Sequence, residues 1–378
     1  MPPSPSLPTN SYAPIAVGSP GFSGSAPLGS LACPFCSCTG QAPPCCQCRE
    51  TVPKSDVRSG ADGAPGSSPA GGPLRSRSVT AVSVRVPAKV NLQLSVGPLR
   101  DDGYHDLVSV FHAVSLFDEL SAEPNEELAV RVEGASAEEV PADGDNLAAR
   151  AARLLAERIG VHPGVLLRIR KAIPVAGGMA GGSADAAAAL VACDRLWNAG
   201  LEPGELAELG AAIGSDVPFA LLGATAVGLG RGERLSPVPV KGRFHWVFAL
   251  AEGGLSTPAV YAECDRLRAA HGEWIGAPQV SERLTTALAN GDAKELGSAL
   301  ANDLQPAAIM LRPSLRRTLT ASRDLGALGA LVSGSGPTCA FLAESDAHAL
   351  DLAAALSDAG VARSIARAYG PVPGATVL

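Results

Sequence analysis

The chain has 378 residues, 46% of them hydrophobic and 18% charged, which suits one large domain or two of ordinary size. Its formal net charge is −7, and the residues after position 78 carry 25 Lys and Arg against 34 Asp and Glu, without a basic cluster. This acidic body argues against a nucleic-acid-binding domain, because such domains contact phosphates through clustered Lys and Arg. A small anionic ligand remains compatible with it, since a few donors aimed at one site can outweigh the net charge.

Membrane and secretion signals are not expected either. No apolar run approaches the roughly 18 residues that cross a bilayer. The first residues also lack a basic start followed by an apolar stretch, because prolines interrupt them throughout. We therefore expect a soluble cytoplasmic protein without a membrane partner.

Residues 1–78 differ sharply in composition from the rest. They hold 14 Pro, 10 Gly and 14 Ser, about half of the segment, and few periodic apolar residues. Such a segment cannot offset its ordering entropy, so we expect a disordered extension. Six of the nine cysteines lie in it: Cys33, Cys36, Cys38, Cys45, Cys46 and Cys48. Thiolates at this density are typical of a zinc site, but proline-rich spacers and the lack of His favour an unstructured extension, and translation from a start near Val79 is another alternative.

From Val82 to Leu94 apolar residues recur at every second position, which predicts a strand. Lys89, Asn91 and Gln93 then share the polar face of that strand. Pro87 cannot donate to a ladder, so it indicates an edge or a bulge just before this face. Taken alone, Lys89 is most simply a solvated strand lysine.

The next features are a turn, a helix and a strand. Residues 100–106 form a turn-rich connection that carries the pair Tyr104 and His105, which in isolation suggests only a loop. Residues 146–159 place apolar side chains at near-helical spacing after Asp145 and Asn146, either of which is a good helix start. Residues 165–170 alternate as a short strand.

A glycine-rich loop, residues 174–185, lies between that strand and an alanine-rich helix expected from Ala186 to Trp197. A strand, a glycine loop and a helix start are the arrangement that binds phosphate, because backbone N–H groups can approach the anion there. The loop is not a Walker motif, since Ser183 stands where the lysine is required. A phosphate-binding lysine must then come from elsewhere in the chain. The alternative is a tight turn of small residues for helix packing.

Two later segments carry further candidate functional residues. Asp216 lies in an expected loop between apolar runs, where an isolated aspartate is most often a cap or turn residue. Residues 333–338 join a glycine–serine turn to an apolar strand, and such a turn either binds an anion through its backbone donors or merely reverses the chain.

Three segments, in this order, resemble the motifs of the GHMP small-molecule kinases: Pro87–Leu92, Pro174–Ala187 and Ser333–Thr338. Each motif is weak alone, whereas the ordered set is specific. The chain most resembles the branch of this family that phosphorylates a cytidine-diphosphate methylerythritol. That likeness rests on Lys89–Leu92, Asp102–His105, Gly214–Pro218, Ser256–Pro258 and Asn302–Asp303. It runs from Val82 to the C-terminus and leaves the extension unmatched.

The resemblance implies an α+β fold of two domains with ATP and substrate between them. The first, residues 79–240, would be the ATP-binding domain, with a ribosomal protein S5 domain 2-like fold. The second, residues 241–378, would be ferredoxin-like. We place the join near residue 240, where prolines interrupt the pattern.

The resemblance also implies a reaction and its residues. The γ-phosphoryl group of ATP would pass to the 2-hydroxyl of the methylerythritol unit, with Mg²⁺ on the phosphates and Asp216 and Lys89 as catalytic residues. Asn91, Tyr104, His105 and Tyr261 would bind the substrate, with Tyr261 stacked on the cytosine. The residues expected around ATP are Pro174, Val175, Ala176, Gly177, Gly178, Met179, Ala180, Gly181, Gly182, Ser183 and Ala184. The metal ligands stay open, and we expect a monomer or a homodimer.

Two alternatives remain at this point. One is a kinase of the same superfamily that acts on homoserine, mevalonate or a sugar, which would lack the Tyr–His pair and the Thr–Pro segment. The other is a binding or regulatory protein that keeps the fold without catalysis, against which Lys89 and Asp216 speak.

Overall fold

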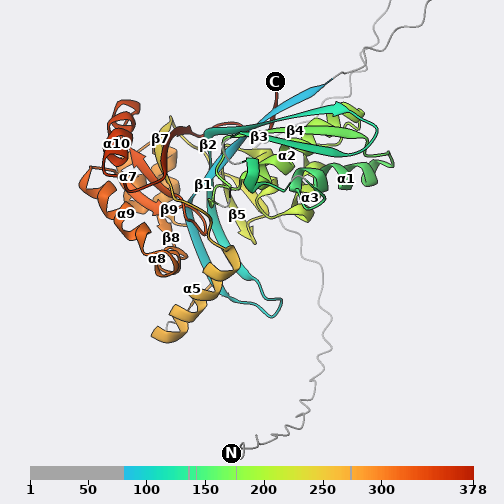
Figure 1. Ribbon diagram of the computed structural model, residues 1–378. Helices are drawn as coiled ribbons and strands as arrows, with labels where there is room; N and C mark the ends of the chain where they lie inside the picture. Colours follow the sequence, from blue (N-terminus) through green and yellow to red (C-terminus); the bar gives the residue numbers. More distant parts are fainter. Residues whose placement is uncertain (1–80, 135–136, 142, 176, 273–274) are drawn as a thin grey trace, which may run out of the picture. The chain divides into compact units, whose positions relative to one another are not determined.

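The computed structural model describes residues 81–134, 137–141, 143–175, 177–272 and 275–378 (Figure 1). These residues belong to one compact unit that spans residues 74–378. The expected disordered extension 1–78, its cysteine cluster and loop residue Ala176 lie outside the described residues.

The first sheet is built on a long antiparallel pair, β1 and β2, which Figure 1 shows running the length of the molecule. Its order is β12-β1-β2-β4-β3, with β5 also paired to β2, β6 to β5 and β8 to β1. The strands of this sheet are β1 (Val82–Leu99), β2 (His105–Pro124), β3 (Ala129–Gly134), β4 (Val165–Lys171), β5 (Thr225–Gly230), β6 (Arg234–Pro237), β8 (Ala301–Asn302) and β12 (Thr376–Val377).

The strand predicted from Val82 is confirmed, and so is the bulge at Pro87. The register of β1 against β2 shifts between Pro87 and Ala88, which re-aims the residues that follow. The polar face after this bulge is buried rather than solvated, since Lys89, Asn91 and Gln93 are all buried. The simple interpretation of Lys89 as a solvated lysine is therefore wrong.

Helices cover one side of this sheet. They are α1 (Leu147–Ile159), α2 (Gly181–Trp197), α3 (Pro203–Ile213) and α4 (Val217–Leu222), with a short 3-10 turn, η1 (Ala137–Glu139), before them. The predicted start of α1 is confirmed, because the Asn146 side chain accepts hydrogen bonds from the backbone N–H groups of Ala148 and Ala149. The predicted start of α2 is five residues late. Ala180 takes a left-handed conformation (φ 61°) and ends the loop, so the helix already begins at Gly181.

The second sheet has the order β11-β7-β10-β9, and all of its neighbouring strands are antiparallel. In chain order its strands therefore lie as fourth, first, third and second, which is the ferredoxin-like arrangement that we expected. The strands are β7 (Phe244–Leu250), β9 (Gly329–Val332), β10 (Cys339–Ala343) and β11 (Ser364–Gly370). The accompanying helices are α5 (Thr257–His271), α6 (Glu282–Asn290), α7 (Ala293–Ala299), α8 (Gln305–Leu311), α9 (Ser314–Asp324) and α10 (Asp346–Asp358).

The two sheets are joined through a shared core. His112 of β2 packs its ring near Phe244 and Trp246 of β7, with centroids 6.0 and 6.1 Å away. The expected join near residue 240 falls between β6 and β7 and stays a prediction. The short strands β8 and β12, from the later part of the chain, pair with β1 of the first sheet.

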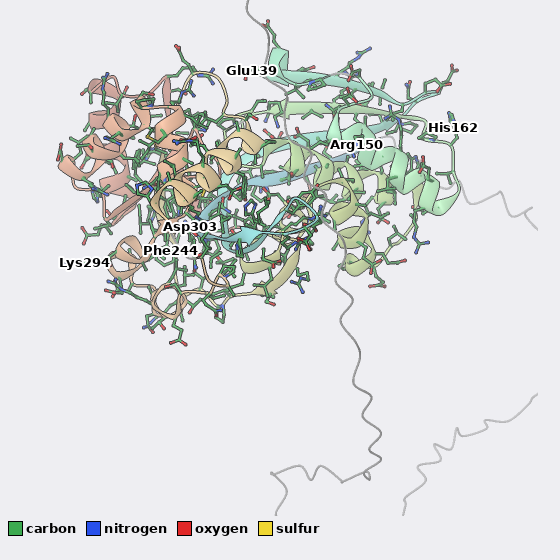
Figure 2. The ribbon with its side chains drawn as sticks, turned by 90° about the horizontal axis from the view of Figure 1, so that it is seen from below. Glu139, Arg150, His162, Phe244, Lys294 and Asp303 are labelled. Atoms are coloured by element: carbon green, nitrogen blue, oxygen red, sulfur yellow. The ribbon has the colours of Figure 1, made fainter. Side chains whose placement is uncertain are left out.

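Polar and charged side chains such as Glu139, His162 and Lys294 are exposed at the periphery (Figure 2). In the part of the chain that the structure describes, no helix has the length and apolar character to cross a bilayer.

Candidate active site

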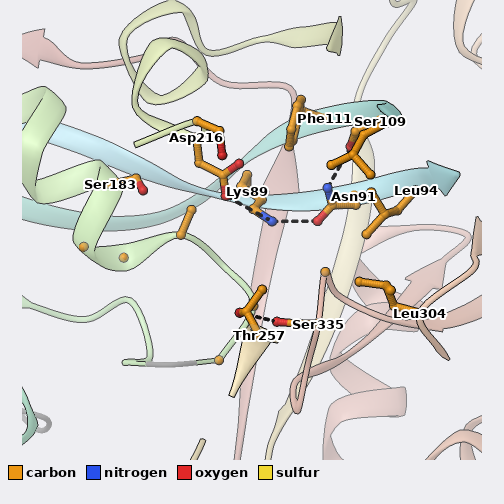
Figure 3. Close-up of a pocket in the computed structure, with 18 of the residues that line it drawn as sticks. Lys89, Asn91, Leu94, Ser109, Phe111, Ser183, Asp216, Thr257, Leu304 and Ser335 are labelled. Atoms are coloured by element: carbon orange, nitrogen blue, oxygen red, sulfur yellow. Dashed lines mark hydrogen bonds and ion pairs between the residues drawn. The ribbon is translucent and has the colours of Figure 1, made fainter. Parts of the chain in front are cut away.

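A cavity of about 480 Å³ lies where β1, the glycine loop, the start of α4 and the 333–338 turn meet. Lys89, Asn91, Ser183 and Asp216 line it, together with residues of both glycine-containing segments. Figure 3 shows Lys89 between Asp216 and Asn91. The fold therefore brings the three motifs of the sequence to one place.

Lys89 is held by two oxygen atoms. Its Nζ donates to Asn91 Oδ1 at 2.6 Å and lies 3.6 Å from Asp216 Oδ2. Asn91 in turn donates through Nδ2 to Ser109 Oγ at 2.8 Å, which fixes the orientation of its amide. The ammonium is thus locked in place, with its charge directed at Asp216 and the cavity.

Asp216 follows α3 and immediately precedes α4, so two helices set the position of its backbone. Its side chain is 28% exposed, against 8% for Lys89. The carboxylate therefore opens to the cavity while the lysine supports it from behind. Burial, followed by the charge of Asp216, raises the pKa of Tyr261, so this tyrosine stays a neutral hydroxyl.

The glycine loop is joined to the 333–338 turn. Ser333 Oγ donates to the carbonyl oxygen of Gly178 at 3.0 Å, and Thr338 N donates to that of Gly177 at 3.3 Å. Gly178 has φ +76°, and a Cβ built on it would lie 2.0 Å from the carbonyl oxygen of Ser333. Only glycine fits this contact, which accounts for one of the loop's four glycines.

The loop residues expected around ATP divide into three groups. Those that line the main cavity are Pro174, Gly177, Gly178, Ala180, Gly181, Gly182 and Ser183. Val175 lines a neighbouring cavity of about 210 Å³, which shares Leu147 and Gly182 with the main one. Met179 and Ala184 point into the core and are fully buried.

The residues expected to bind the substrate lie next to the main cavity. Tyr104, His105 and Tyr261 line a further cavity of about 620 Å³. His105 Nε2 lies 3.0 Å from Asp265 Oδ1, and the His105 and Tyr261 rings are 5.3 Å apart. Tyr104 is half exposed (51%) at the rim. The two cavities share five lining residues: Leu107, Ser215, Arg231, Thr257 and Tyr261.

Comparisons with known proteins show the family of this chain. The family models described as GHMP kinases N terminal domain and GHMP kinases C terminal match residues 146–224 and 284–362. A 4-diphosphocytidyl-2-C-methyl-D-erythritol kinase of Thermobifida fusca is 61% identical over 307 residues, covering 79% of this chain and 99% of the relative. The chain belongs to the GHMP kinase family.

Further relatives of this GHMP kinase extend the comparison. The enzyme of the same name from Streptomyces avermitilis is 58% identical over 297 residues, covering 79% of this chain and 99% of the relative. A crystal structure of 4-(cytidine 5'-diphospho)-2C-methyl-D-erythritol kinase matches with 35% identity and a TM-score of 0.63, over 76% of this chain and 98% of the other. Mevalonate kinase of L. major, in complex with R-mevalonate, is 17% identical with a TM-score of 0.58, over 79% and 99% of the two chains, and shares the fold.

Sequence reasoning missed a buried charge cluster under the glycine loop of this GHMP kinase. Lys171, at the end of β4, donates to Asp118 Oδ2 and, at 2.7 Å, to Asp185 Oδ2 on α2. Asp118 Oδ1 also accepts from the backbone N–H groups of Ala172 and Ile173. The cluster therefore ties β2, β4 and α2 together on both sides of the loop. The only sequence signal was a lysine and an aspartate flanking the glycines.

Burial raises the pKa of Asp185 to about 7, because its charged form is poorly solvated. Its Oδ1 is buried and has no hydrogen-bond partner among the described residues. Burial lowers the pKa of Lys171, but Asp185 and Asp118 outweigh this, and the net shift is upward. The lysine is thus the permanent cation of the cluster.

The site also fits a metal carried by the nucleotide. Among the described residues, no three or more His, Cys, Asp or Glu side chains gather as a metal cluster. Mg²⁺ in phosphoryl-transfer sites usually takes one or two protein ligands and completes its shell with phosphate oxygens and water. The hydroxyl of Ser183 lines the main cavity and matches that requirement.

Proposed function

We propose that this GHMP kinase transfers the γ-phosphoryl group of ATP to the 2-hydroxyl of 4-diphosphocytidyl-2-C-methyl-D-erythritol, giving the 2-phosphate and ADP, a step in making isoprenoid precursors. The observation that carries the proposal is that the Lys89–Asp216 pair shares one cavity with the glycine loop. The aromatic cavity adjoining it supplies a place for the cytidine end. The relatives that match this chain over 79% of its length carry the name of this enzyme.

In the reaction, the 2-hydroxyl oxygen forms a bond to the γ-phosphorus as the bond to the β-phosphate oxygen breaks. The proton of the hydroxyl passes to Asp216, whose carboxylate opens to the cavity, or Asp216 orients that hydroxyl for attack. Lys89 offsets the negative charge on the reacting groups. Phosphoryl transfer needs positioning and charge neutralisation more than covalent chemistry, and these two side chains supply both.

The nucleotide would lie along the glycine loop. Residues of that loop and of the first turn of α2 line the main cavity, and the unpaired backbone N–H groups of a helix start are donors that phosphates need. The neighbouring cavity of about 210 Å³ adjoins the same loop through Gly182 and is our proposed place for the base of ATP. The hydroxyl of Ser183 would hold Mg²⁺, which when bound supplies charge stabilisation to the phosphate oxygens.

The cytidine would lie in the aromatic cavity. Tyr261 is placed to stack on the pyrimidine, because its ring lines both this cavity and the main one. His105 is held by Asp265 at 3.0 Å and presents an oriented ring beside Tyr261. Tyr104 would close the rim. This cavity distinguishes the proposal from a kinase of homoserine or mevalonate, whose acceptors carry no base.

A coupled assay for ADP release tests the proposal. The full chain is assayed with ATP, Mg²⁺ and, in turn, cytidine-diphosphate methylerythritol, homoserine and mevalonate as acceptor. We expect turnover with the first alone, and phosphorus NMR should show a new phosphomonoester on the product. Turnover with homoserine or mevalonate would reassign the acceptor, and turnover with none would refute the kinase assignment.

We further propose that the enzyme works in the cytoplasm as a monomer or homodimer and binds no nucleic acid. The acidic composition of residues after position 78 supports the last point. Light scattering on the eluting protein measures the assembly, and a labelled-DNA shift assay at low salt checks the nucleic-acid prediction.

A further inference from the structure

Arg231 lies at the tip of the β5–β6 hairpin, in the turn between the two strands. Its neighbours Gly230 and Gly232 have φ values of +76° and +106°, which only glycine adopts readily. The backbone of the turn is closed by a hydrogen bond that Gly232 N donates to the carbonyl oxygen of Leu229 at 3.1 Å. Arg231 lines both the main cavity and the aromatic cavity.

Among the described residues, no carboxylate forms an ion pair with the guanidinium of Arg231. Among the described residues that line the two cavities, the Lys and Arg side chains are Lys89 and Arg231. Lys89 pairs with Asp216, whereas the recorded partner of the Arg231 guanidinium is the ring of Tyr104, 4.9 Å from its centroid. The nearby Glu233 accepts from the backbone N–H of Arg231, at 2.7 Å. In the described part of this acidic protein, a guanidinium without an ion-pair partner thus lies at the border of the two cavities.

A ligand that fills both cavities must pass this border. The residues common to both are two apolar or aromatic side chains, two hydroxyls and Arg231. If the base lies against Tyr261 and the reacting hydroxyl near Asp216, the part of the substrate that crosses the border is its diphosphate. This step rests on the function proposed above.

We propose that Arg231 binds the diphosphate of the substrate and makes the enzyme specific for acceptors that carry one. A guanidinium presents a planar fork that matches phosphate oxygens with two hydrogen bonds, which an ammonium does not. The Arg231 guanidinium carbon lies over the ring of Tyr104, 4.9 Å from its centroid, which favours its position at the border. In this role Arg231 is a specificity determinant rather than a catalytic residue.

The test measures the binding of CDP and of cytidine to the full chain by calorimetry, without ATP. Wild type should bind CDP more tightly than cytidine. Arg231→Gln should weaken CDP binding by about tenfold to a hundredfold, the usual worth of a charged hydrogen-bonded contact, and leave cytidine binding unchanged. Arg231→Lys should fall between, because it keeps the charge and loses the fork. In turnover, KM for the diphosphate substrate should rise while kcat at saturation stays near that of wild type.

Arg234→Gln is the matched control, since it removes the same charge from the same hairpin at a residue outside both cavities. It should behave as wild type. An Arg231→Gln variant that keeps the preference for CDP over cytidine would overturn the inference. An equal loss of affinity for CDP and cytidine in Arg231→Gln would also overturn it, because it would point to a displaced Tyr104. A wild type that binds CDP no more tightly than cytidine would overturn it as well. Normal turnover with an unchanged KM in Arg231→Gln would leave the proposed kinase activity standing and remove only this role.

Discussion

Lys89 Nζ lies 3.6 Å from Asp216 Oδ2, although the two residues come from a strand near the start of the fold and from the junction of two later helices. The glycine loop has no lysine of its own at the position where a Walker motif requires one. Lys89 lines the same cavity as that loop, so the fold brings a cation to it from β1. In our proposal, the ammonium of Lys89 therefore offsets the charge of the ATP phosphates and also pairs with the carboxylate of Asp216.

Removing the charge of Asp216 tests this pairing directly. Asp216→Asn keeps the size of the side chain and the contact with Lys89, but it cannot take up a proton. We expect kcat to fall by about 10²–10⁴-fold, the range for a lost general base. Asp351→Asn, at an exposed position of α10, is the control and should keep full activity. A near-normal kcat in Asp216→Asn would refute the role as base.

The site residues could be predicted from the sequence mainly where a motif or a period marks them. The period-two pattern placed Lys89, Asn91 and Gln93 on one face of β1, and that is where they lie. A period cannot say whether such a face meets solvent. Here later segments cover it: Gln93 donates to the carbonyl oxygen of Gln279, and Lys89 lies under the turn at Gly334.

The rest of the site could not be predicted because it depends on contacts between distant segments. Lys171, Asp118 and Asp185 each look like ordinary surface charges in the sequence, and only the packing of α2 on the sheet buries them together. Arg231 likewise could not be singled out in the sequence, because its proposed role depends on the two cavities that it lines. The helix start at Gly181 was missed for a local reason, since a left-handed alanine rather than a glycine ends the loop.

A second prediction concerns the close contact at Gly178. Gly178→Ala would push a methyl group against the carbonyl oxygen of Ser333 and separate the glycine loop from its supporting turn. We expect ATP binding, measured by calorimetry, to weaken at least tenfold. Gly200→Ala is the matched control: its φ is +66°, but a Cβ there meets nothing within 4 Å. It should cost about 1–2 kcal/mol of stability through backbone strain and leave ATP binding intact. Equal ATP affinity in the two variants would contradict the prediction.

A third prediction separates the members of the buried cluster. Lys171→Met leaves the Asp118 and Asp185 carboxylates buried without their cation, so the free energy of unfolding should fall by about 3–5 kcal/mol. Asp185→Asn should cost much less, because the amide oxygen still accepts from Lys171 and Asp118 still balances its charge. Urea unfolding measures both. The prediction fails if the two substitutions destabilise the protein equally.

The fourth prediction concerns acid stability and rests on His112, which is fully buried between β2 and β7. Burial lowers the pKa of its imidazole to about 3 from an unfolded value of 6.5. Between these values the unfolded chain binds a proton that the folded chain does not, so stability is lost as the pH falls below 6.5. At pH 5 this group alone should remove about 2 kcal/mol relative to pH 8. His112→Gln lacks the titrating ring. Between pH 8 and pH 5, its free energy of unfolding, measured in urea, should therefore fall by about 2 kcal/mol less than that of wild type. His162→Gln, at an exposed position, is the control and should follow wild type. An unchanged pH dependence in His112→Gln would show that His112 is not the source of the acid sensitivity.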